Sequence, residues 1–402
     1  QQLQILSGMI SSYMRFQGSV ASRLPEAAMA ELRRDAREVA ASVTDERALG
    51  GYLAAEGFFP FWLNGAGGQV TEAHLAEANA SAERALDIGR RLNDPNLQSA
   101  ALDALAGNGG LIDDDWRGSR EYSRQRLAIQ DRLDLFEKVD AHSMVVWSSA
   151  FLGELDEADR VSAQGLAQVQ PGQVPAVVLH LVVWRVYVLT LLGRWDEALS
   201  MAQRARQLLV ESNQSAAGYA QRGFIAAMDI ARARQDEELL EVYGRINDEI
   251  ASAFAEGSRF RHWLGYGTDD LESIQVAVEH FLPAPRQQLE RLERGLSRLS
   301  DRGRWPSADG LASLLAFCRQ AEYPVLEGQT ERALGLAHRD PIRQQRAIAL
   351  FDRAGARPYA ARVRCERALL TGDHDELSAG LAVLEEIGDT EQILRFERLQ
   401  VG

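Results

Sequence analysis

A short pattern built around glycine recurs along this chain, and it limits what the chain can fold into. The pattern is glycine, any residue, a larger residue, Asp, Glu, and then Ala or Leu, and it appears as GELDEA from Gly153, GRWDEA from Gly193 and GDHDEL from Gly372. The first two copies are 40 residues apart. A repeat of this length predicts one structural unit copied along the chain. Weaker copies lie around Trp116, after Ala233 and near Asp340.

The chemistry of the pattern predicts a helical hairpin. Glycine ends one helix in a left-handed or turn conformation, Asp or a neighbouring residue caps the next helix, and Glu favours its first turn. The small alanines that follow let two helices approach closely. A single hairpin cannot bury its apolar face alone, so we expect the hairpins to stack into a right-handed superhelix with a continuous core and a concave inner surface.

Helical spacing of apolar residues continues through most of the chain, while strand signals are almost absent. Apolar residues recur every three or four positions in segments 74–92, 237–254, 286–300 and 375–388. The sequence therefore predicts an all-α fold, an α-α superhelix of about eight to ten hairpins that residues 1–402 form as a single solenoid. Gly, Pro and aromatic residues interrupt the spacing near 57–73 and 256–285, where we expect long loops between helices and soft breaks in the array.

The copy at Gly193 resembles a tetratricopeptide (TPR) repeat, whose turn is Gly, Tyr and Asp-Glu-Ala, followed by an alanine further along the second helix. The residues at those places here are Gly193, Trp195, Asp196, Glu197, Ala198 and Ala205. The resemblance implies a TPR-like solenoid in which the first helix of each hairpin lines the concave face. The 40-residue spacing departs from the family's usual period of about 34 residues, so helix lengths and superhelical pitch are expected to differ.

The segment Ala333–Asp389, and above all DRAGARPYAARVR within it, resembles the helical-repeat tail of large bacterial signalling proteins. Such tails follow a STAND-type ATPase in LuxR-type regulators and in ATPase-linked class III nucleotide cyclases. The resemblance implies a C-terminal regulatory region, of the cyclase type in preference to the LuxR type, because the chain stops just after the last repeat. The start, QQLQIL, has neither an initiator methionine nor a basic signal-peptide region, so we expect the chain to be part of a longer protein.

Composition excludes several classes of function. The net charge of -14 would repel a nucleic-acid backbone, and no run of basic residues overrides it. Lys138 is the only lysine and lies in a helical pattern, which argues against a phosphate-binding P-loop and against a Schiff-base enzyme. Cys318 and Cys365 are too few for a disulfide framework or a zinc site, so we expect reduced core thiols, a cytoplasmic protein, and neither a metal nor a cofactor.

One apolar segment, residues 174–193, approaches the length of a membrane span. Arg185 would lie near its middle, where a charge costs about 2.5–3.5 kcal/mol on insertion scales, and His180 adds to that cost. We therefore expect a buried helix and no contact with a membrane.

The most specific candidate site is the concave groove implied by the TPR resemblance. Helical spacing supports it independently, because residues 140, 143 and 147 share one helix face, as do 180, 183 and 187. An aromatic and polar strip of this kind suits a peptide, a partner helix or a small ligand. The alternative is that Trp147 and Tyr187 merely pack between hairpins. The predicted groove residues are Asp140, Ser143, Trp147, His180, Tyr187, Gln221, Met228 and Arg232.

A secondary candidate is an aromatic and basic cluster that could clamp an anionic or planar ligand, although aromatic residues that anchor a loop explain it equally well. It consists of Arg259, Arg261, His262, Trp263 and Tyr266.

Taken together, the sequence predicts a non-enzymatic interaction or effector-sensing module. Its partner would be a protein, a peptide, a small effector or the upstream domains of the same polypeptide. One alternative is the tail of a LuxR-type transcriptional regulator. The other is an enzyme with an unrecognised site, for which Glu256, His262 and Asp269 are the residues to consider. The common catalytic motifs HExxH, CxxC, GxSxG and GxGxxG are absent from the sequence.

Overall fold

The computed structural model describes residues 1–15, 24–65, 68–212, 218–252, 271–279 and 289–401. Within these ranges the regular secondary structure is helical and there is no strand, which confirms the predicted all-α fold. The helices are α1 (Gln2–Met14), α2 (Glu26–Ala40), α3 (Glu46–Glu56), α4 (Phe59–Gly65), α5 (Glu72–Arg91), α6 (Pro95–Asp113), α7 (Trp116–Ala128), α8 (Leu135–Phe151), α9 (Leu155–Ala167), α10 (Pro175–Leu192), α11 (Trp195–Glu211), α12 (Gln221–Ala233), α13 (Glu237–Ser252), α15 (Leu271–Glu279), α16 (Leu289–Asp301), α17 (Ala308–Gln320), α18 (Pro324–His338), α19 (Pro341–Ala354), α20 (Arg357–Thr371), α21 (His374–Ile387) and α22 (Thr390–Val401).

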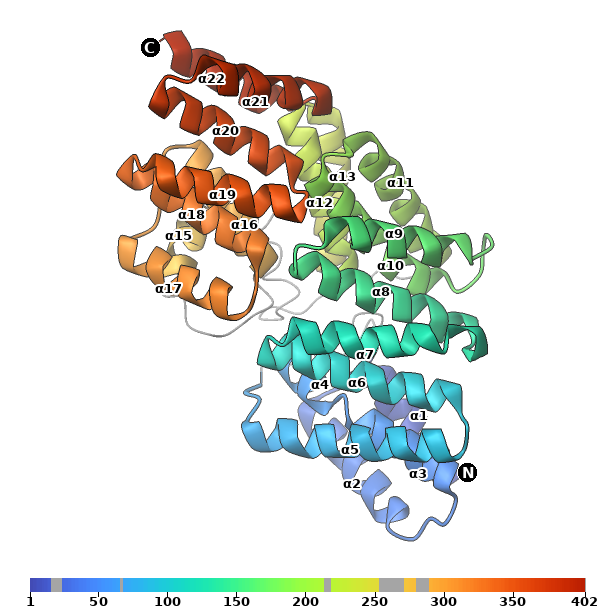
Figure 1. Ribbon diagram of the computed structural model, residues 1–402. Coiled ribbons are helices and arrows are strands. Elements are labelled where there is room, and N and C mark those ends of the chain that lie inside the picture. The colour runs from blue at the N-terminus through green and yellow to red at the C-terminus, as the bar shows by residue number, and fades with distance from the viewer. Residues whose placement is uncertain (16–23, 66–67, 213–217, 253–270, 280–288, 402) are drawn as a thin grey trace.

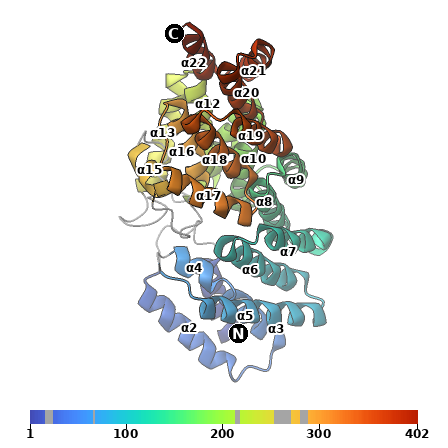
Figure 2. The same ribbon diagram turned by 60° about the vertical axis from the view of Figure 1, so that its left-hand side comes forward.

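The helices form three groups, which Figures 1 and 2 show from two directions. Helices α1 to α7 make a base at the N-terminal end, α8 to α13 make a first arm, and α15 to α22 make a second arm. The two arms lie side by side, with α10 in contact with α20 and α12 in contact with α22. The contacts follow the same order in both arms, so the second arm runs alongside the first in the same direction.

Consecutive helices pair as the repeat predicts. Packed pairs are α6 with α7, α8 with α9, α10 with α11, α12 with α13, α18 with α19, and α20 with α21. The corner of each pair holds one residue with a left-handed backbone, and these corners coincide with the three clear and three weaker copies of the glycine pattern. The corner residues are Asp114, Gly153, Gly193, Gln235, Arg339 and Gly372. In the first arm, α10 also packs on α8 and on α12, so these three helices form its inner row.

The sequence predicts that Asp or a neighbouring residue caps the helix after each corner, and the three clear corners differ in this respect. After Gly372, Asp373 caps the next helix by accepting a hydrogen bond from the backbone amide of Glu376 at 3.0 Å. The corners at Gly153 and Gly193 have no side-chain cap. Their Asp residues lie two positions beyond the N-cap, inside the first turn, where the carboxylate interacts with the positive end of the helix dipole instead of accepting a capping bond.

Buried side chains join the two arms. The ring of Tyr323, which precedes α18, lies 5.1 Å from the ring of Phe151 on α8 and 6.0 Å from that of Trp116 on α7. Further along the contact, the hydroxyl of Tyr187 on α10 donates a hydrogen bond to Glu293 on α16 at 2.7 Å. The second arm therefore packs against the inner row of the first arm, at Phe151 of α8 and at Tyr187 of α10.

The two predicted interruptions of the array contain short helices. Helix α4 lies within 57–73, and α15 lies within 256–285, most of which is outside the described residues. Phe58 and Trp62 are only 5% and 2% exposed and belong to the core of the base. Burial of these rings stabilises a helical turn where Gly and Pro alone predicted a loop.

Among the described residues, one helix, α10, is long enough and apolar enough to cross a membrane. In the folded chain 72% of it is buried, as expected for a core helix. Arg185 near its middle does not face an apolar surface, because its guanidinium lies 2.9 Å from Asp159 and 3.2 Å from the hydroxyl of Ser162. These partners on α9 offset the cost of placing a charge in this helix.

Gly153 lies where the two arms meet, so a substitution at Gly153 measures how closely the arms pack. Its φ is +69°, and an added Cβ would lie 2.4 Å from Pro324 Cγ and 3.2 Å from Ala354 Cβ, both in the second arm. We expect Gly153→Ala to cost about 2 kcal/mol beyond the strain of a left-handed alanine, because overpacking a well-filled contact is destabilising. Urea unfolding followed by circular dichroism measures the loss.

Gly372 supplies the matched control. It occupies the same place in the pattern, its φ is +76°, and no atom of the described residues lies within 4 Å of an added Cβ. Gly372→Ala should therefore cost only the backbone strain, about 1–2 kcal/mol. Equal losses of unfolding free energy in the two variants would contradict the close packing of the arms at Gly153.

Candidate functional site

Asp140, on α8, lies in a buried cluster of charges where the base meets the first arm. Its carboxylate accepts hydrogen bonds from Arg126 at 2.6 Å and from Arg15 at 3.2 Å. The same two guanidiniums pair with Asp103 and Glu137. Burial opposes the charge on Asp140, but Arg126 and Arg15 outweigh it and hold its pKa below the ordinary value. In this structure Asp140 therefore ties the base to the first arm.

Ser143 and Trp147 lie on the same face of α8, as the spacing predicted, and both are buried. The Ser143 hydroxyl donates to the carbonyl of Val139 at 3.1 Å. The Trp147 ring lies 6.0 Å from that of Trp184 and 5.0 Å from that of Trp116. These contacts fit the packing alternative, and a role in partner binding stays a prediction for both residues.

Of the next three predicted residues, Gln221 and Met228 are buried and His180 is half-buried. The His180 ring accepts a hydrogen bond from the Trp184 indole at 3.2 Å, and burial lowers its pKa to about 4, so the ring is neutral at pH 7. Gln221 is fully buried, and within the described part of the chain neither polar atom of its side-chain amide has a hydrogen-bond partner. Met228 is 6% exposed and belongs to the main core.

The remaining two predicted residues, Tyr187 and Arg232, line one pocket between the arms. The pocket has a volume of about 230 Å³ and lies where α10 and α12 of the first arm face α16, α20 and α22 of the second. Its lining includes Tyr187, Thr190, Leu191, Trp195, Asp229, Ile230, Arg232, Ala233, Arg294, Ser297, Arg298, Asp301, Arg302, Pro358, Tyr359, Arg362, Glu391, Gln392, Arg395 and Arg398. Seven of these residues are arginines and three are carboxylates, so the pocket is basic in a chain that is acidic overall.

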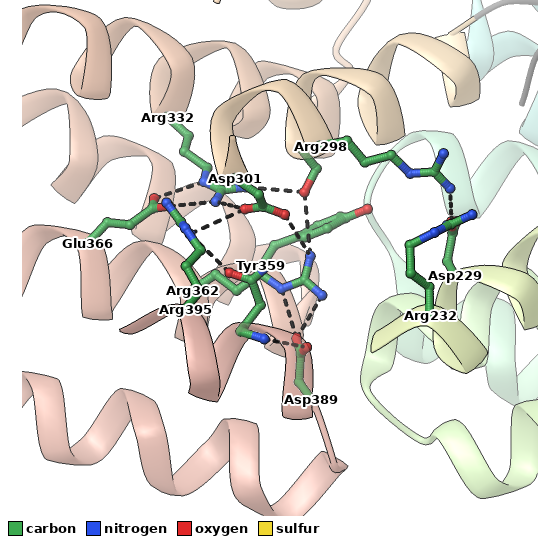
Figure 3. A network of polar contacts seen from close by, with 12 residues as sticks. Asp229, Arg232, Arg298, Asp301, Arg332, Tyr359, Arg362, Glu366, Asp389 and Arg395 are labelled. Atoms are coloured by element: carbon green, nitrogen blue, oxygen red, sulfur yellow. Dashed lines mark hydrogen bonds and ion pairs between the residues drawn. The ribbon is translucent and has the colours of Figure 1, made fainter. Parts of the chain in front are cut away.

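On the second-arm side of the pocket, arginines and carboxylates pair in a buried network (Figure 3). Arg332, which is 0% exposed, donates two hydrogen bonds to Glu366, at 2.8 and 2.6 Å. Arg332 and Arg395 both reach Asp301, and their attraction, against burial, lowers the Asp301 pKa. Arg362 donates two hydrogen bonds to Asp389, at 2.9 and 2.7 Å, and together these pairs fix this wall of the pocket.

On the first-arm side, Asp229 of α12 is shared by three arginines (Figure 3 shows two of them). Its oxygens lie 3.2 Å from Arg232 and 3.3 Å from Arg294, and they also accept a hydrogen bond from Arg298. Burial opposes ionisation of Asp229, but Arg298, Arg294 and Arg232 outweigh it and lower its pKa. These four residues together carry a net positive charge.

A buried carboxyl group, Glu293, lies beside two tyrosines of the pocket lining, Tyr187 and Tyr359. It accepts hydrogen bonds from the hydroxyls of Tyr187 at 2.7 Å and Tyr359 at 3.1 Å, one from each arm. Burial raises the pKa of Glu293 to about 7, and the nearby Glu290 acts in the same direction, while Arg294 and the two tyrosines oppose the rise. Glu293 is thus an inter-arm contact whose charge changes near neutral pH.

The secondary candidates Arg259, Arg261, His262, Trp263 and Tyr266 lie outside the described residues, as do Glu256, His262 and Asp269 of the enzyme alternative.

Sequence reasoning missed the arginines that the second arm contributes to the pocket. A signal for them existed, because Arg294, Arg298 and Arg302 recur every four residues and therefore share one face of a helix. Nothing in the spacing, however, indicates that this face meets the first arm.

Two solved structures are similar to this chain at low sequence identity. No family model matches it, and none of the curated proteins matches it in sequence. A Rap protein complexed with competence and sporulation factor is similar in structure, with 13% identity and a TM-score of 0.40 over 87% of this chain and 99% of that chain. A circular tandem repeat protein with novel repeat topology and enhanced subunit contact surfaces is similar with 15% identity and a TM-score of 0.16, over 100% of this chain and 98% of that chain. At such TM-scores the pocket has to be interpreted from this chain alone.

Proposed function

We propose that this chain is a non-enzymatic helical-repeat module that binds an acidic segment of a peptide or protein partner in the pocket between its arms. The observation that carries the proposal is the excess of arginine in the pocket of an acidic protein. Arginine is favoured where carboxylates or phosphates are recognised, because its planar group offers several donors in a fixed geometry. A chain with a net charge of -14 repels acidic partners elsewhere, so the pocket selects where they bind.

The position of the pocket suits a module that senses its ligand. The lining comes from both arms, so an anion bound there contacts Arg232 of the first arm and Arg298 of the second at once. A ligand shifts a conformational equilibrium only by its different affinity for the two states, and a ligand that bridges the arms favours the closed arrangement. We propose that the module serves as a regulatory region of a larger cytoplasmic signalling protein, in line with the resemblance of residues 333–389 to the tails of such proteins.

The proposal is tested by selecting ligands with no prior assumption about their charge. A random peptide display library is panned on the immobilised chain, and enriched peptides are synthesised and titrated by fluorescence anisotropy. We expect enrichment in Asp and Glu. We also expect Arg398→Glu to weaken binding by about tenfold or more, the value of one lost charge-assisted hydrogen bond.

Arg398 is a suitable position because it is exposed on α22 and donates a hydrogen bond from its Nε to the carbonyl of Leu394 on the same helix. The matched control is Arg90→Glu, an exposed arginine on α5 of the base. Selection of peptides without an acidic bias, or equal weakening by both substitutions, would discard the pocket as the binding site.

A further inference from the structure

We propose that the pocket between the arms is built for a phosphate monoester, and that Arg294 and the arginines around it hold the dianion. This inference rests on the proposed function and deepens it, because it names the acidic group that the pocket takes. The group can come from a phosphorylated side chain of a peptide or from a free small phosphate, and the experiment below distinguishes these two sources.

The first argument is that one N–H donor of Arg294 lacks an acceptor among the described residues. Its side chain is 91% buried, and it lines the pocket from α16. Its Nε lies 3.3 Å from Asp229, whereas its Nη2, which is itself buried, has no hydrogen-bond partner among the residues that the structure describes. A buried guanidinium N–H that lacks an acceptor is costly, so an oxygen ligand toward which the Arg294 side chain turns this N–H would be bound strongly.

The directions from which the arginines reach the pocket supply the second argument. Arg232 comes from α12, Arg294 and Arg298 come from α16, and Arg362 and Arg395 come from α20 and α22. A carboxylate has two oxygens in one plane, so donors from one side satisfy it. A phosphate monoester has three terminal oxygens that point in different directions, and it can accept hydrogen bonds from donors that surround it.

Charge supplies the third argument. The lining holds seven arginines and three carboxylates, and its buried partners Arg332, Glu366 and Asp389 bring the count to eight arginines and five carboxylates. Three positive charges therefore remain in excess, and a single negative charge would leave two of them uncompensated. A phosphate monoester carries about 1.5–2 negative charges near pH 7, whereas a carboxylate or a sulfate ester carries one. The pocket should therefore prefer the phosphate on charge as well as on shape.

The size and walls of the pocket limit what else the ligand can contain. Its volume of about 230 Å³ is below the usual range of sites for drug-sized molecules, so it admits a small group and its stem. Trp195, Pro358 and Tyr359 provide apolar surface beside the arginines, against which the stem of the ester can lie. The pocket thus fits a phosphorylated side chain or a small phosphate better than a nucleotide.

Isothermal titration calorimetry of the full chain with four probes tests the inference. The probes are a terminally blocked Gly-phosphoserine-Gly peptide, the same peptide with glutamate, the same peptide with serine O-sulfate, and inorganic phosphate. We expect the phosphoserine peptide to bind at least tenfold more tightly than the glutamate and sulfate peptides. The sulfate peptide separates charge from shape, because it is tetrahedral but carries one charge. If the phosphoserine peptide exceeds inorganic phosphate, the source is a phosphorylated segment, and the reverse order indicates a free phosphate.

Two variants test whether the phosphoserine peptide binds at Arg294 and Arg232. Arg294→Lys keeps the charge but removes the spare N–H, and it should weaken the phosphoserine peptide at least tenfold. Arg232→Lys, at a more exposed position, gives the same test if Arg294→Lys does not fold. Arg364→Lys on α20 is the control, because Arg364 pairs with Asp352 outside the pocket lining and should leave the affinity unchanged.

The outcomes separate the inference from the proposed function. If Asp- and Glu-rich peptides from the display library bind the pocket and the phosphoserine peptide has no advantage, the phosphate inference is overturned and the proposed function stands. Wild-type affinity for the phosphoserine peptide in folded Arg294→Lys and Arg232→Lys also overturns it. If neither the selected peptides nor any anion binds, both fail.

Discussion

Replacing Arg126 by methionine should lower the free energy of unfolding by about 4 kcal/mol, the largest effect we expect from a single substitution. Arg126 is 0% exposed and pairs with Asp103, Glu137 and Asp140, and it also donates a hydrogen bond to Ser99. Removing it leaves three buried carboxylates that share one remaining guanidinium, that of Arg15. Uncompensated buried charge of this kind is among the most destabilising changes in a folded protein. Chemical unfolding monitored by circular dichroism measures the effect.

Arg124, two residues earlier on the same helix, supplies the control. Its side chain is 43% exposed and lies 3.4 Å from Glu157. Exposed ion pairs contribute about 0–1 kcal/mol, so Arg124→Met should leave the unfolding curve almost unchanged. If Arg126→Met proved as mild as Arg124→Met, the charge cluster would not hold the base to the first arm.

Replacing Glu293 by glutamine should remove most of the pH dependence of stability between pH 5 and pH 8. The pKa of Glu293 is raised from 4.5 to about 7 in the folded chain, so the folded state binds the proton more tightly than the unfolded state does. Its stabilising contribution is therefore complete below pH 4.5 and is lost as the pH rises through 7. A shift of this size corresponds to about 3 kcal/mol. The variant, which cannot ionise, should keep its stability across this range.

Urea unfolding at a series of pH values in wild type and Glu293→Gln measures the two slopes. Tyr187→Phe gives an independent check of sign, because the Tyr187 hydroxyl donates to the ionised carboxylate and lowers its pKa. Without that donor, the loss of stability should move to higher pH. Identical pH profiles in wild type and Glu293→Gln would show that Glu293 is not the group that titrates.

The hairpins could be predicted from the sequence because their chemistry is local. A left-handed residue between two amphipathic segments is enough to turn the chain, and the pattern at Gly153, Gly193 and Gly372 identified three such corners. The weaker copies were harder, because Gln235 and Arg339 adopt the same left-handed backbone without being glycine. There, packing of the paired helices imposes a conformation that the residue itself does not favour.

The packing of the arms could not be predicted, because it joins residues far apart in sequence. Tyr187 donates its hydrogen bond to Glu293, which follows 106 residues later in the chain. The same holds for the pocket, to which α12 contributes Arg232 and α16 contributes Arg298. A repeat pattern describes how each unit meets the next one, and it is silent about contacts between units that are not neighbours.

The way the second arm closes over the first also affects how the chain is made. Domains emerge from the ribosome N-terminus first, at about 5–20 residues per second. Helices α8 to α12 are therefore synthesised well before residues 289–401, whose Tyr323 later covers Phe151. During that interval the aromatic rings that the second arm later covers are exposed on the nascent chain. The partly synthesised chain therefore needs a chaperone more than the complete protein does.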